Sequence, residues 1–567
     1  MHEIRTSKGN TTHSSSRYTI QALLLMALLS LALLALDSAL SASAASSIPE
    51  PPGKPLAQPK LSEGEAAGWA LLPAAPLNIT YSIYLPTIFK NGCEWSDDSP
   101  FGIQIAALSL FQAMFAGGAE QVWAEQEFDK QSEALAQSGV KWSRLRIMWK
   151  EIEPIQGNYL WEYYDDKIAE AASTGTQLIA TIADNPSWAA PSACGPLTPT
   201  MYTELVKFVT DVVKHYKDPP YNVKYWQLYN EPDGAPHGSY TEEWFSSNGF
   251  GCWGKNEFGR WWGETGADEY AYMLSQIYLA IKAADSEAKV IFGGIAYDAF
   301  MQYEPNCSYC PFDRYFIDNV FQSPGGKQFD IMSFHYFPDF HCEWDEQYGY
   351  RYGRDIEAKA NYLREKLTQY DLGNKPIICT EVSEHGYPGN TESLEKQANY
   401  VVQGNARGMA AGLQNIIWFC LVSPPYDPYE QGLLYEDPET GKLIPKPAYY
   451  AYQVLARELT GAHYKRKFYH SNPNIEGYVF GVRCDTKEKT VIWSNPIPYP
   501  LCNPSVYTPT QANVSFPVAQ SLRVVDRDGN EQIIQDGGSG DLDRQWNGAV
   551  TILVDSRNKP LYVMADP

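Results

Sequence analysis

Short apolar runs alternate with longer amphipathic stretches over the middle of the chain, from about residue 101 to residue 461. The amphipathic stretches repeat their apolar positions with the 3.6-residue period of a helix, whereas the short runs have the length of buried strands. Eight such runs begin at Gly102, Trp142, Gln177, Val223, Val290, Phe329, Lys375 and Asn415. Eight strands that alternate with helices predict an α/β fold, a (β/α)8 TIM barrel. The alternative, a doubly wound open sheet, usually has a Gly-rich turn after its first strand, and none follows residues 102–108.

The pattern changes after residue 461. Short runs with period-two alternation follow, and turn signals rich in Gly and Asp separate them. These runs are EGYVFGVRC, KTVIWSN, SLRVVD, NEQIIQD and AVTILVD. They predict a small C-terminal all-β sandwich domain over residues 462–567, behind a barrel domain over residues 93–461.

A leader and a linker precede the barrel. The apolar run at residues 22–36 follows a weakly basic stretch and precedes the small-residue sequence Ala42-Ser43-Ala44. Because the run is shorter than the ~20 residues of a membrane span, it predicts a secretory signal peptide at residues 1–44, with a retained N-terminal anchor as the alternative. Residues 45–92 are rich in Pro and Ala and predict a linker. Within it, YSIYLPTIFKN resembles a segment found behind the signal peptides of secreted bacterial proteins. We expect a secreted, extracellular protein that leaves the membrane once the signal is cleaved.

Composition narrows the functional classes. The chain of 567 residues has 44 Lys and Arg against 67 Asp and Glu, a net charge of −23. An acidic surface repels phosphate backbones, so we expect no nucleic-acid partner, and the acidic balance is compatible with a monomer. Aromatic residues make up 14% of the chain, including 39 Tyr and 16 Trp, which favours surfaces on which sugar rings stack.

The ten cysteines point to disulfides or free thiols rather than to a metal site. Cys307-x-x-Cys310 has the spacing of half a zinc site, but no second ligand pair follows at similar spacing. Cys379 and Cys420 lie in apolar runs, so we expect both to be buried. Connectivity among the rest stays open.

Carboxylates end two of the eight runs. Glu231 follows the fourth run in Asn230-Glu231-Pro232, and Glu381 ends the seventh, where Glu384 is a local alternative. The C-terminal ends of barrel strands meet at one face, so we expect the two carboxylates to lie together. Such a pair suits cleavage of a glycosidic bond, in which one acid protonates the leaving oxygen and one carboxylate attacks the anomeric carbon. We expect Glu231 to keep its proton near neutrality and Glu381, beside an arginine, to stay ionised.

Further polar and aromatic residues end the same runs. The substrate-binding candidates are Asn230, Arg144 (with Arg146 as the alternative), His335, Tyr336, Trp418, Asn185 and Trp188. A loop over residues 234–264, rich in Trp and Phe, either walls a sugar-binding cleft or packs as a small subdomain.

On these residues the barrel, over about residues 100–460, resembles glycoside hydrolase clan A, the 4/7 superfamily, with families 39 and 5 as the most similar members. Asn230-Glu231-Pro232 is similar to the acid/base motif of the clan, and Ile378-Cys379-Thr380-Glu381 is similar to its nucleophile strand. The resemblance implies a retaining, two-step mechanism with Glu231 as acid/base and Glu381 as nucleophile. It also implies that Arg144 supports the nucleophile and that Trp418 floors the subsite of the attacked sugar. Asn230 would bind the hydroxyl next to the anomeric carbon.

Two other functions fit parts of the pattern. A non-catalytic carbohydrate-binding protein on a glycosidase-like barrel would normally have lost one carboxylate, and both are present. A metal-dependent hydrolase needs His and Asp clusters at strand ends, but the chain has nine His and no His-x-His after the first run. The sequence therefore predicts a secreted hydrolase of β-linked poly- or oligosaccharides that uses no metal and no cofactor.

Overall fold

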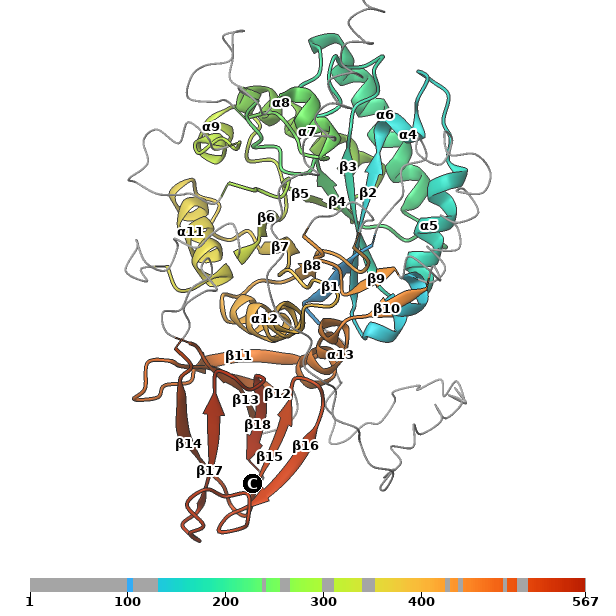
Figure 1. Ribbon diagram of the computed structural model, residues 1–567. Helices are drawn as coiled ribbons and strands as arrows, with labels where there is room; N and C mark the ends of the chain where they lie inside the picture. Colours follow the sequence, from blue (N-terminus) through green and yellow to red (C-terminus); the bar gives the residue numbers. More distant parts are fainter. Residues whose placement is uncertain are drawn as a thin grey trace, which may run out of the picture. The chain divides into compact units, whose positions relative to one another are not determined.

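The computed structural model describes ten stretches of the chain, all within one compact unit that spans Thr87–Pro567 (Figure 1). They are residues 99–105, 131–236, 241–254, 266–297, 311–338, 352–423, 429–436, 442–482, 487–496 and 508–565. The expected signal peptide, the linker and Cys307-x-x-Cys310 lie outside these stretches. None of the helices within them combines the length and the apolar character that a membrane span requires.

Eight parallel strands form the barrel. They are β1 (Phe101–Gln104), β2 (Trp142–Met148), β3 (Gln177–Ala183), β4 (Tyr225–Leu228), β5 (Lys289–Ile291), β6 (Met332–Tyr336), β7 (Ile377–Val382) and β8 (Ile416–Trp418). Their order is β5-β4-β3-β2-β1-β8-β7-β6, and the parallel bridges Ile291–Ile331 and Ile295–Phe334 connect the two ends of this row. Each strand overlaps one of the eight predicted runs, so the (β/α)8 barrel is confirmed. A doubly wound sheet is excluded because consecutive strands are neighbours throughout.

Helices surround these strands (Figure 1). They are α4 (Trp149–Ile152), α5 (Glu162–Ser173), α6 (Tyr202–Tyr216), α7 (Glu242–Ser247), α8 (Gly266–Ala284), α9 (Phe316–Gln322), α11 (Ile356–Gln369), α12 (Thr391–Ala410) and α13 (Pro447–Leu459). In α6, Leu205, Phe208, Val209 and Val212 are all buried, which is the spacing of a single apolar helix face. That face explains why the segment forms a helix against the barrel.

Side chains along the strands alternate between the barrel interior and its outer face. One interior layer is apolar and consists of Ile179, Ile291, Ile331, Ile378 and Ile417. Two positions further toward the C-terminal strand ends, the inward side chains become polar: Gln104, Arg144, Thr181, Gln227, Ser333 and Thr380. The candidate site lies above this polar layer.

The C-terminal residues form two antiparallel sheets. The larger has the order β11 (Ala462–Lys467), β12 (Ile475–Val482), β13 (Glu488–Ser494), β18 (Leu561–Ala565), β15 (Ser521–Asp526) and β16 (Glu531–Gln535). The smaller pairs β14 (Gln511–Pro517) with β17 (Ala549–Asp555). A separate apolar cluster, which includes Val514, Leu522 and Val550, draws on both sheets. The predicted β region is therefore confirmed, and β11, β14 and β18 are strands that the sequence pattern did not identify.

Buried charges connect the barrel helices to the β region. Arg407 on α12 donates from Nε and Nη2 to the Glu476 carboxylate at 2.8 and 3.0 Å, and from Nη1 to Asp355 at 2.5 Å. Burial pushes the pKa of Glu476 upward, but Arg407, Arg354 and Asn495 together lower it to about 2. Glu476 therefore stays charged inside the interface and pairs with a guanidinium from the barrel.

Candidate active site

Glu231 and Glu381 lie together at the C-terminal ends of β4 and β7. One carboxylate oxygen of each, and one ring nitrogen of His335, lie within 4.8 Å of one another. Each of the two glutamates is 5% exposed. Two carboxyl groups that lie this close together and are this deeply buried do not both ionise readily.

A β-bulge directs Glu381 into the barrel. In the pairing of β6 with β7, Phe334 faces Cys379 and the next residue, His335, faces Glu381, so Thr380 is the extra residue. Thr380 Oγ1 accepts a hydrogen bond from Gln227 inside the barrel. Without the bulge, strict alternation would turn the residue after Thr380 outward. The bulge therefore explains how Thr380 and Glu381 both face inward.

The backbone around Glu231 has an uncommon conformation. Glu231 has a φ of 48° and Tyr229 a φ of 61°, both in the left-handed region that residues other than glycine rarely adopt. The segment is held by the bridge between Asn230 and Gly294 and by the bond from Gly251 N to Asn230 O at 2.6 Å. Such strain persists only where the surrounding structure fixes it, and it concentrates at functional sites.

Arg144 on β2 connects the carboxylate pair to the polar layer. Its Nη1 atom lies 2.5 Å from Glu381 Oε1, and its Nη2 donates to Asn230 Oδ1 at 2.7 Å. Its other bonds go to Gln104, Thr181 and Gln227 on three further strands. Arg146, the alternative in the sequence, instead donates to Asp184 at 3.2 Å. The structure thus places Arg144, and not Arg146, against Glu381.

His335 on β6 lies between the two carboxylates. Its Nδ1 is 2.8 Å from Glu231 Oε1 and 3.4 Å from Glu381 Oε2. Its Nε2 faces the backbone of Gly294, where a Cβ atom would lie only 2.1 Å away. Burial, together with Arg144 and Lys359, holds the pKa of His335 well below its ordinary value. The ring is therefore neutral and shares one hydrogen bond with Glu231.

The two carboxyl groups differ in their electrostatic surroundings. Burial raises the pKa of Glu231 well above its ordinary value, and the charges of Glu381 and Asp233 raise it further. Burial also raises the pKa of Glu381, but there Arg144 opposes the rise by charge and by hydrogen bond. The pKa of Glu381 is therefore not below its ordinary value, although the ion pair with Arg144 alone would lower it. The difference between the two pKa values is nevertheless in the expected direction, with Glu231 raised more, because Arg144 donates a hydrogen bond to Glu381 and not to Glu231.

The same three side chains are a possible metal-ligand set. Within the described stretches, Glu231, His335 and Glu381 form the one group of potential ligand atoms that lie close enough together. The Arg144 guanidinium, 2.5 Å from Glu381 Oε1, already places a positive charge on that carboxylate. A cation would have to displace this ion pair. A site without metal stays our prediction.

Asn185 and Trp188 belong to the loop after β3. Asn185 accepts a hydrogen bond from Tyr229 Oη and donates to Ser192 O at 3.3 Å. Trp188 Nε1 donates to Glu153 O at 2.9 Å, and its ring packs edge-on against Trp149. Both therefore have structural partners beside the site, and their contact with substrate stays a prediction.

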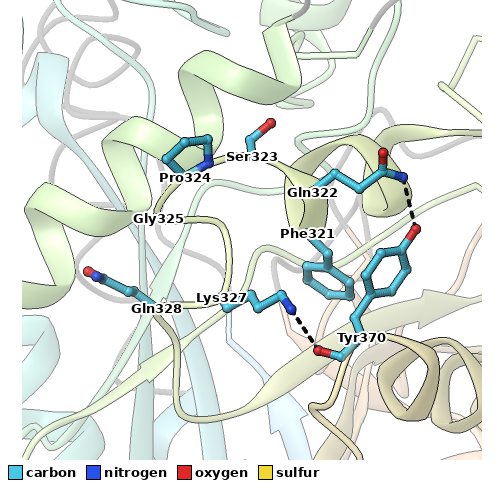
Figure 2. Close-up of a pocket in the computed structure, with 8 residues that line it drawn as sticks. All are labelled: Phe321, Gln322, Ser323, Pro324, Gly325, Lys327, Gln328 and Tyr370. Atoms are coloured by element: carbon cyan, nitrogen blue, oxygen red, sulfur yellow. Dashed lines mark hydrogen bonds between the residues drawn. The ribbon is translucent and has the colours of Figure 1, made fainter.

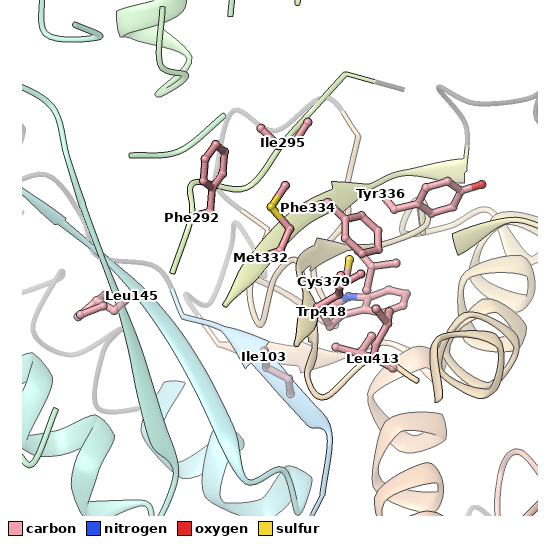
Figure 3. Close-up of a cluster of buried hydrophobic side chains, with 14 of the residues drawn as sticks. Ile103, Leu145, Phe292, Ile295, Met332, Phe334, Tyr336, Cys379, Leu413 and Trp418 are labelled. Carbon is pink, nitrogen blue, oxygen red and sulfur yellow. The ribbon is translucent and has the colours of Figure 1, made fainter. Parts of the chain in front are cut away.

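Tyr336 and Trp418 lie on the outer face of the barrel. Figure 3 shows both among buried hydrophobic side chains that include Phe334, Cys379 and Leu413. The reason is the alternation of the strands, because His335 and Ile417 face inward and their neighbours must face outward. This placement speaks against Trp418 as the floor of a sugar subsite. The next residue, Phe419, is half-buried and packs edge-on against Phe337 of the strand end of β6.

The described part of the aromatic loop packs as a small subdomain. Phe245, Cys194 and Cys252 form a buried cluster, with Trp244 and Phe250 packed against it. A disulfide joins Cys194 in the loop after β3 to Cys252 in the loop after β4. Trp261 and Trp262 lie outside the described residues. Cys379 and Cys420 are buried, as predicted. Glu384, the alternative to Glu381, pairs with Lys396 at 3.0 Å.

The polar layer below the carboxylates was not singled out in the sequence. Gln227 accepts from Arg144 Nε at 2.8 Å and donates to Ser333 and Thr380 at 2.8 and 3.0 Å. A signal was present, since Gln227, like the predicted Arg144, is a polar residue at an inward position of an apolar run. The inward positions of each run therefore indicate such a layer.

A pocket lies away from the carboxylates. Figure 2 shows this pocket, about 520 Å³ in volume, beside Phe321, Lys327 and Tyr370. It lies where α9 and α11 end, and hence at the N-terminal side of the strands. Lys327 Nζ donates to Tyr370 O at 2.9 Å, and no carboxylate lines it. The pocket therefore lacks the carboxylate pair that glycoside hydrolysis uses.

Comparisons with known proteins agree with this barrel. Residues 97–418 match the family described as Cellulase (glycosyl hydrolase family 5). The fold is similar to that of a family 39 glycoside hydrolase from the gut symbiont Bacteroides cellulosilyticus WH2, with a TM-score of 0.58 and 17% identity over 83% of this chain and 82% of that chain. It is also similar to a monomeric beta-xylosidase from Caulobacter crescentus CB15, with a TM-score of 0.50 and 14% identity over 82% and 96% of the two chains. No curated protein sequence matches the chain significantly.

Proposed function

The chain belongs to glycosyl hydrolase family 5, and from this membership and the site geometry we propose that it is a secreted, retaining β-glycosidase that hydrolyses β-linked poly- or oligosaccharides. One observation carries the proposal: oxygens of Glu231 and Glu381 lie within 4.8 Å of each other. This fits the ~5–5.5 Å of a retaining pair, whereas an inverting pair is ~6.5–9.5 Å apart to leave room for water.

The reaction takes two steps. In the first, the Glu381 carboxylate attacks the anomeric carbon while Glu231 transfers its proton to the leaving glycosidic oxygen, and a glycosyl ester forms on Glu381. In the second, Glu231 removes a proton from water, whose oxygen attacks the same carbon and releases Glu381. The raised pKa of Glu231 suits the first step, because the group must enter it protonated.

Three neighbours support this chemistry. Arg144 holds the nucleophile by a charge-assisted hydrogen bond and compensates its negative charge before the first step and after the second. Asn230 is held by Arg144 and by Gly249 O, which leaves it in place to bind the hydroxyl next to the anomeric carbon. Neutral His335 orients Glu231 without fixing a second positive charge beside it.

A panel of substrates tests the activity. Reducing-sugar release would be measured on β-glucans, mannans and xylans, and nitrophenol release on 4-nitrophenyl β-glycosides. We expect turnover on one class of β-linked sugar that Glu381→Gly abolishes. The matched control is Glu384→Gln, which changes a buried carboxylate three positions on and should retain turnover. Glycan binding that survives Glu381→Gly, without turnover in any form of the chain, would instead establish a carbohydrate-binding protein.

The acid/base role has its own test. Nitrophenolate leaves readily without a proton, whereas a sugar hydroxyl does not. Glu231→Ala should therefore lose far more activity on the polysaccharide than on the 4-nitrophenyl glycoside in the first step. Equal losses on both substrates would contradict the assignment.

Export can be measured directly. The proposed signal peptide ends at Ala44, so the mature protein recovered from the medium of a secreting host should begin at Ala45. Recovery of the intact N-terminus in the membrane fraction would support the retained anchor.

A further inference from the structure

The segment Ile295–Tyr297, which follows β5, lies between two fully buried opposite charges. Asp233 accepts from Ala296 N at 3.1 Å with one carboxylate oxygen and from Tyr297 N at 2.7 Å with the other. Lys359 on α11 donates from Nζ to Ile295 O at 3.1 Å and to Ala296 O at 3.2 Å. Asp233 and Lys359 are both 0% exposed. The amides of the segment are thus held by the anion and its carbonyls by the cation.

Each charge is also connected to one member of the Glu231–His335 hydrogen bond. Lys359 Nζ donates to the backbone oxygen of His335 at 2.7 Å, its shortest bond. Asp233 lies two residues after Glu231 in the same tight turn, where Gly234 N donates to Glu231 O at 3.2 Å. A shift of either charge would therefore be transmitted to one side of that hydrogen bond.

The segment also touches the site directly. Gly294, the residue before it, is bridged to Asn230 and lies against the His335 ring. His335 N donates to Ile295 O at 3.0 Å. The segment after β5 therefore lies between the loop that carries Glu231 and the strand that carries His335, and contacts both.

Two buried charges at this place are costly unless each compensates the other. Burial raises the pKa of Asp233 to about 7, while the amides of Tyr297 and Ala296 and the charge of Lys359 lower it. Glu231 and Tyr270 of α8 also face Asp233, and the amide of buried Asp313 donates to Asp233 O at 2.7 Å. An apolar pair would fill the same volume but would remove the hydrogen bonds to the amides and carbonyls of the segment, so the two charges hold its backbone in place.

We propose that Asp233 and Lys359 are positioning residues of the reaction, which hold Ile295–Tyr297 between them and thereby keep Glu231 and His335 at hydrogen-bond distance. This role rests on the proposed function of Glu231. Neither residue touches substrate, and both act through the backbone and through their charges. The two charges act on Glu231 in opposite directions, since Asp233 raises its pKa and Lys359 lowers it.

Opposite electrostatic effects give a signature that a purely structural role lacks. In the pH profile of kcat/KM, the alkaline limb is the fall in activity as Glu231 loses its proton. Asp233→Asn should lower the pKa of Glu231 and move this limb to lower pH by roughly half a unit or more, whereas Lys359→Met should raise that pKa and move the limb to higher pH. Both should lower kcat about 10- to 100-fold with little change in KM, because misplacement affects the reacting groups. In the double variant the limb should return toward its original pH.

The experiment uses the mature protein and the best polysaccharide of the panel, because a sugar leaving group needs the Glu231 proton in the first step. The matched control is Asp355→Asn, another fully buried carboxylate with an ion pair and a tyrosine hydrogen bond, remote from the site. It should lower Tm but leave the limb unchanged. If the neutral variants do not fold, Asp233→Glu and Lys359→Arg keep the charges and should lower kcat without moving the limb.

The outcomes separate this role from the proposed function. Glu231→Gln is measured in parallel. If it abolishes turnover while Asp233→Asn and Lys359→Met keep the original kcat and limb, the positioning role is wrong and the proposed function stands. If Glu231→Gln retains full turnover, the acid/base assignment itself is wrong. Limb shifts in the same direction in both variants would also overturn the positioning role.

Discussion

The guanidinium of Arg144 reaches Glu381 across the inside of the barrel, with 2.5 Å between Nη1 and Oε1 and 237 positions between the two residues in sequence. Their strands, β2 and β7, are not neighbours, since β1 and β8 lie between them. The position of Glu381 is therefore fixed by the closed barrel as a whole, and not by its own strand alone.

Arg144→Lys should lower kcat about 100-fold and also lower Tm. A lysine ammonium cannot reach Glu381 and Asn230 together with the polar side chains that the planar guanidinium contacts. Kinetics on the best panel substrate and thermal unfolding would be measured side by side. Arg466→Lys is the control, because Arg466 pairs with Glu488 on the surface of the β region, and both values should stay unchanged. Full activity in Arg144→Lys would contradict support of the nucleophile.

The alkaline limb of kcat/KM should lie well above the ordinary pKa of a glutamate. In the proposed mechanism Glu231 acts as an acid only while protonated, and burial and the charge of Glu381 raise its pKa. Activity should thus persist to higher pH and fall as pH rises through this raised value. Glu231→Gln should remove the limb along with most of the activity on polysaccharide. A limb that survives in that variant would belong to another group.

Glu231→Gln should also raise Tm at alkaline pH. The folded state binds the Glu231 proton more tightly than the unfolded state, so the resulting stability is complete below the unfolded pKa and is lost as pH rises through the folded pKa. Above that pH the original chain buries a charge that glutamine lacks. Thermal unfolding of both forms across the pH range measures the difference. The Tm difference should vanish at low pH. A difference that stays constant across the pH range would contradict its origin in the Glu231 proton.

Phe419→Ala should lower activity, whereas Trp418→Phe should lower thermal stability. Phe419 is half-buried at the strand end beside Glu381, and we expect its loss to lower kcat/KM about 10-fold with little change in Tm. Trp418 is 1% exposed and donates from Nε1 to Gln431 O, so its replacement should lower Tm and leave KM nearly unchanged. Steady-state kinetics and calorimetry on both variants check this. The reverse pattern would restore Trp418 as the sugar platform.

Removal of the disulfide should destabilise the chain. Cys194 and Cys252 are 58 residues apart, and closing a loop of that length stabilises a fold by about 4 kcal/mol in the chain-entropy model. Cys194→Ala/Cys252→Ala should therefore lower Tm by several degrees. Because the bond joins two loops at the strand ends, KM should rise as well. Unchanged Tm and KM would show that the packing of Phe245 suffices.

Excess EDTA should leave activity unchanged. Arg144 already occupies the carboxylate that a cation would need, and the proposed steps use only protons and the two glutamates. Turnover is measured before and after prolonged chelation, and after addition of divalent cations. Loss on chelation with recovery on Zn²⁺ would identify Glu231, His335 and Glu381 as a metal site.

The barrel was predictable because its signals are local. Each of the eight strands has its own apolar run, and Glu231 and Glu381 follow from strand ends alone. The position of Trp418 also follows from local information, because Ile417 faces inward and alternation turns Trp418 outward. The expected role assigned to it came from resemblance and not from that alternation.

The remaining features depend on tertiary structure. The bulge at Thr380 is a property of the pairing between β6 and β7, and an isolated strand would not reveal it. Lys359 lies on a helix 126 positions after Asp233, and nothing in either segment indicates that they hold the same three residues. Buried charges of this kind gain their meaning only from partners that the fold brings together.

The ion pair between Arg407 and Glu476 has a consequence for protein engineering. A chain truncated after Gly461 would lose Glu476 and leave the Arg407 guanidinium beside apolar side chains that now face water. Such a truncation would expose the outer wall of the barrel rather than remove an accessory module. Another β-sandwich swapped in at this place should bring an acid for Nε and Nη2 of Arg407, because Asp355 of the barrel bonds only Nη1.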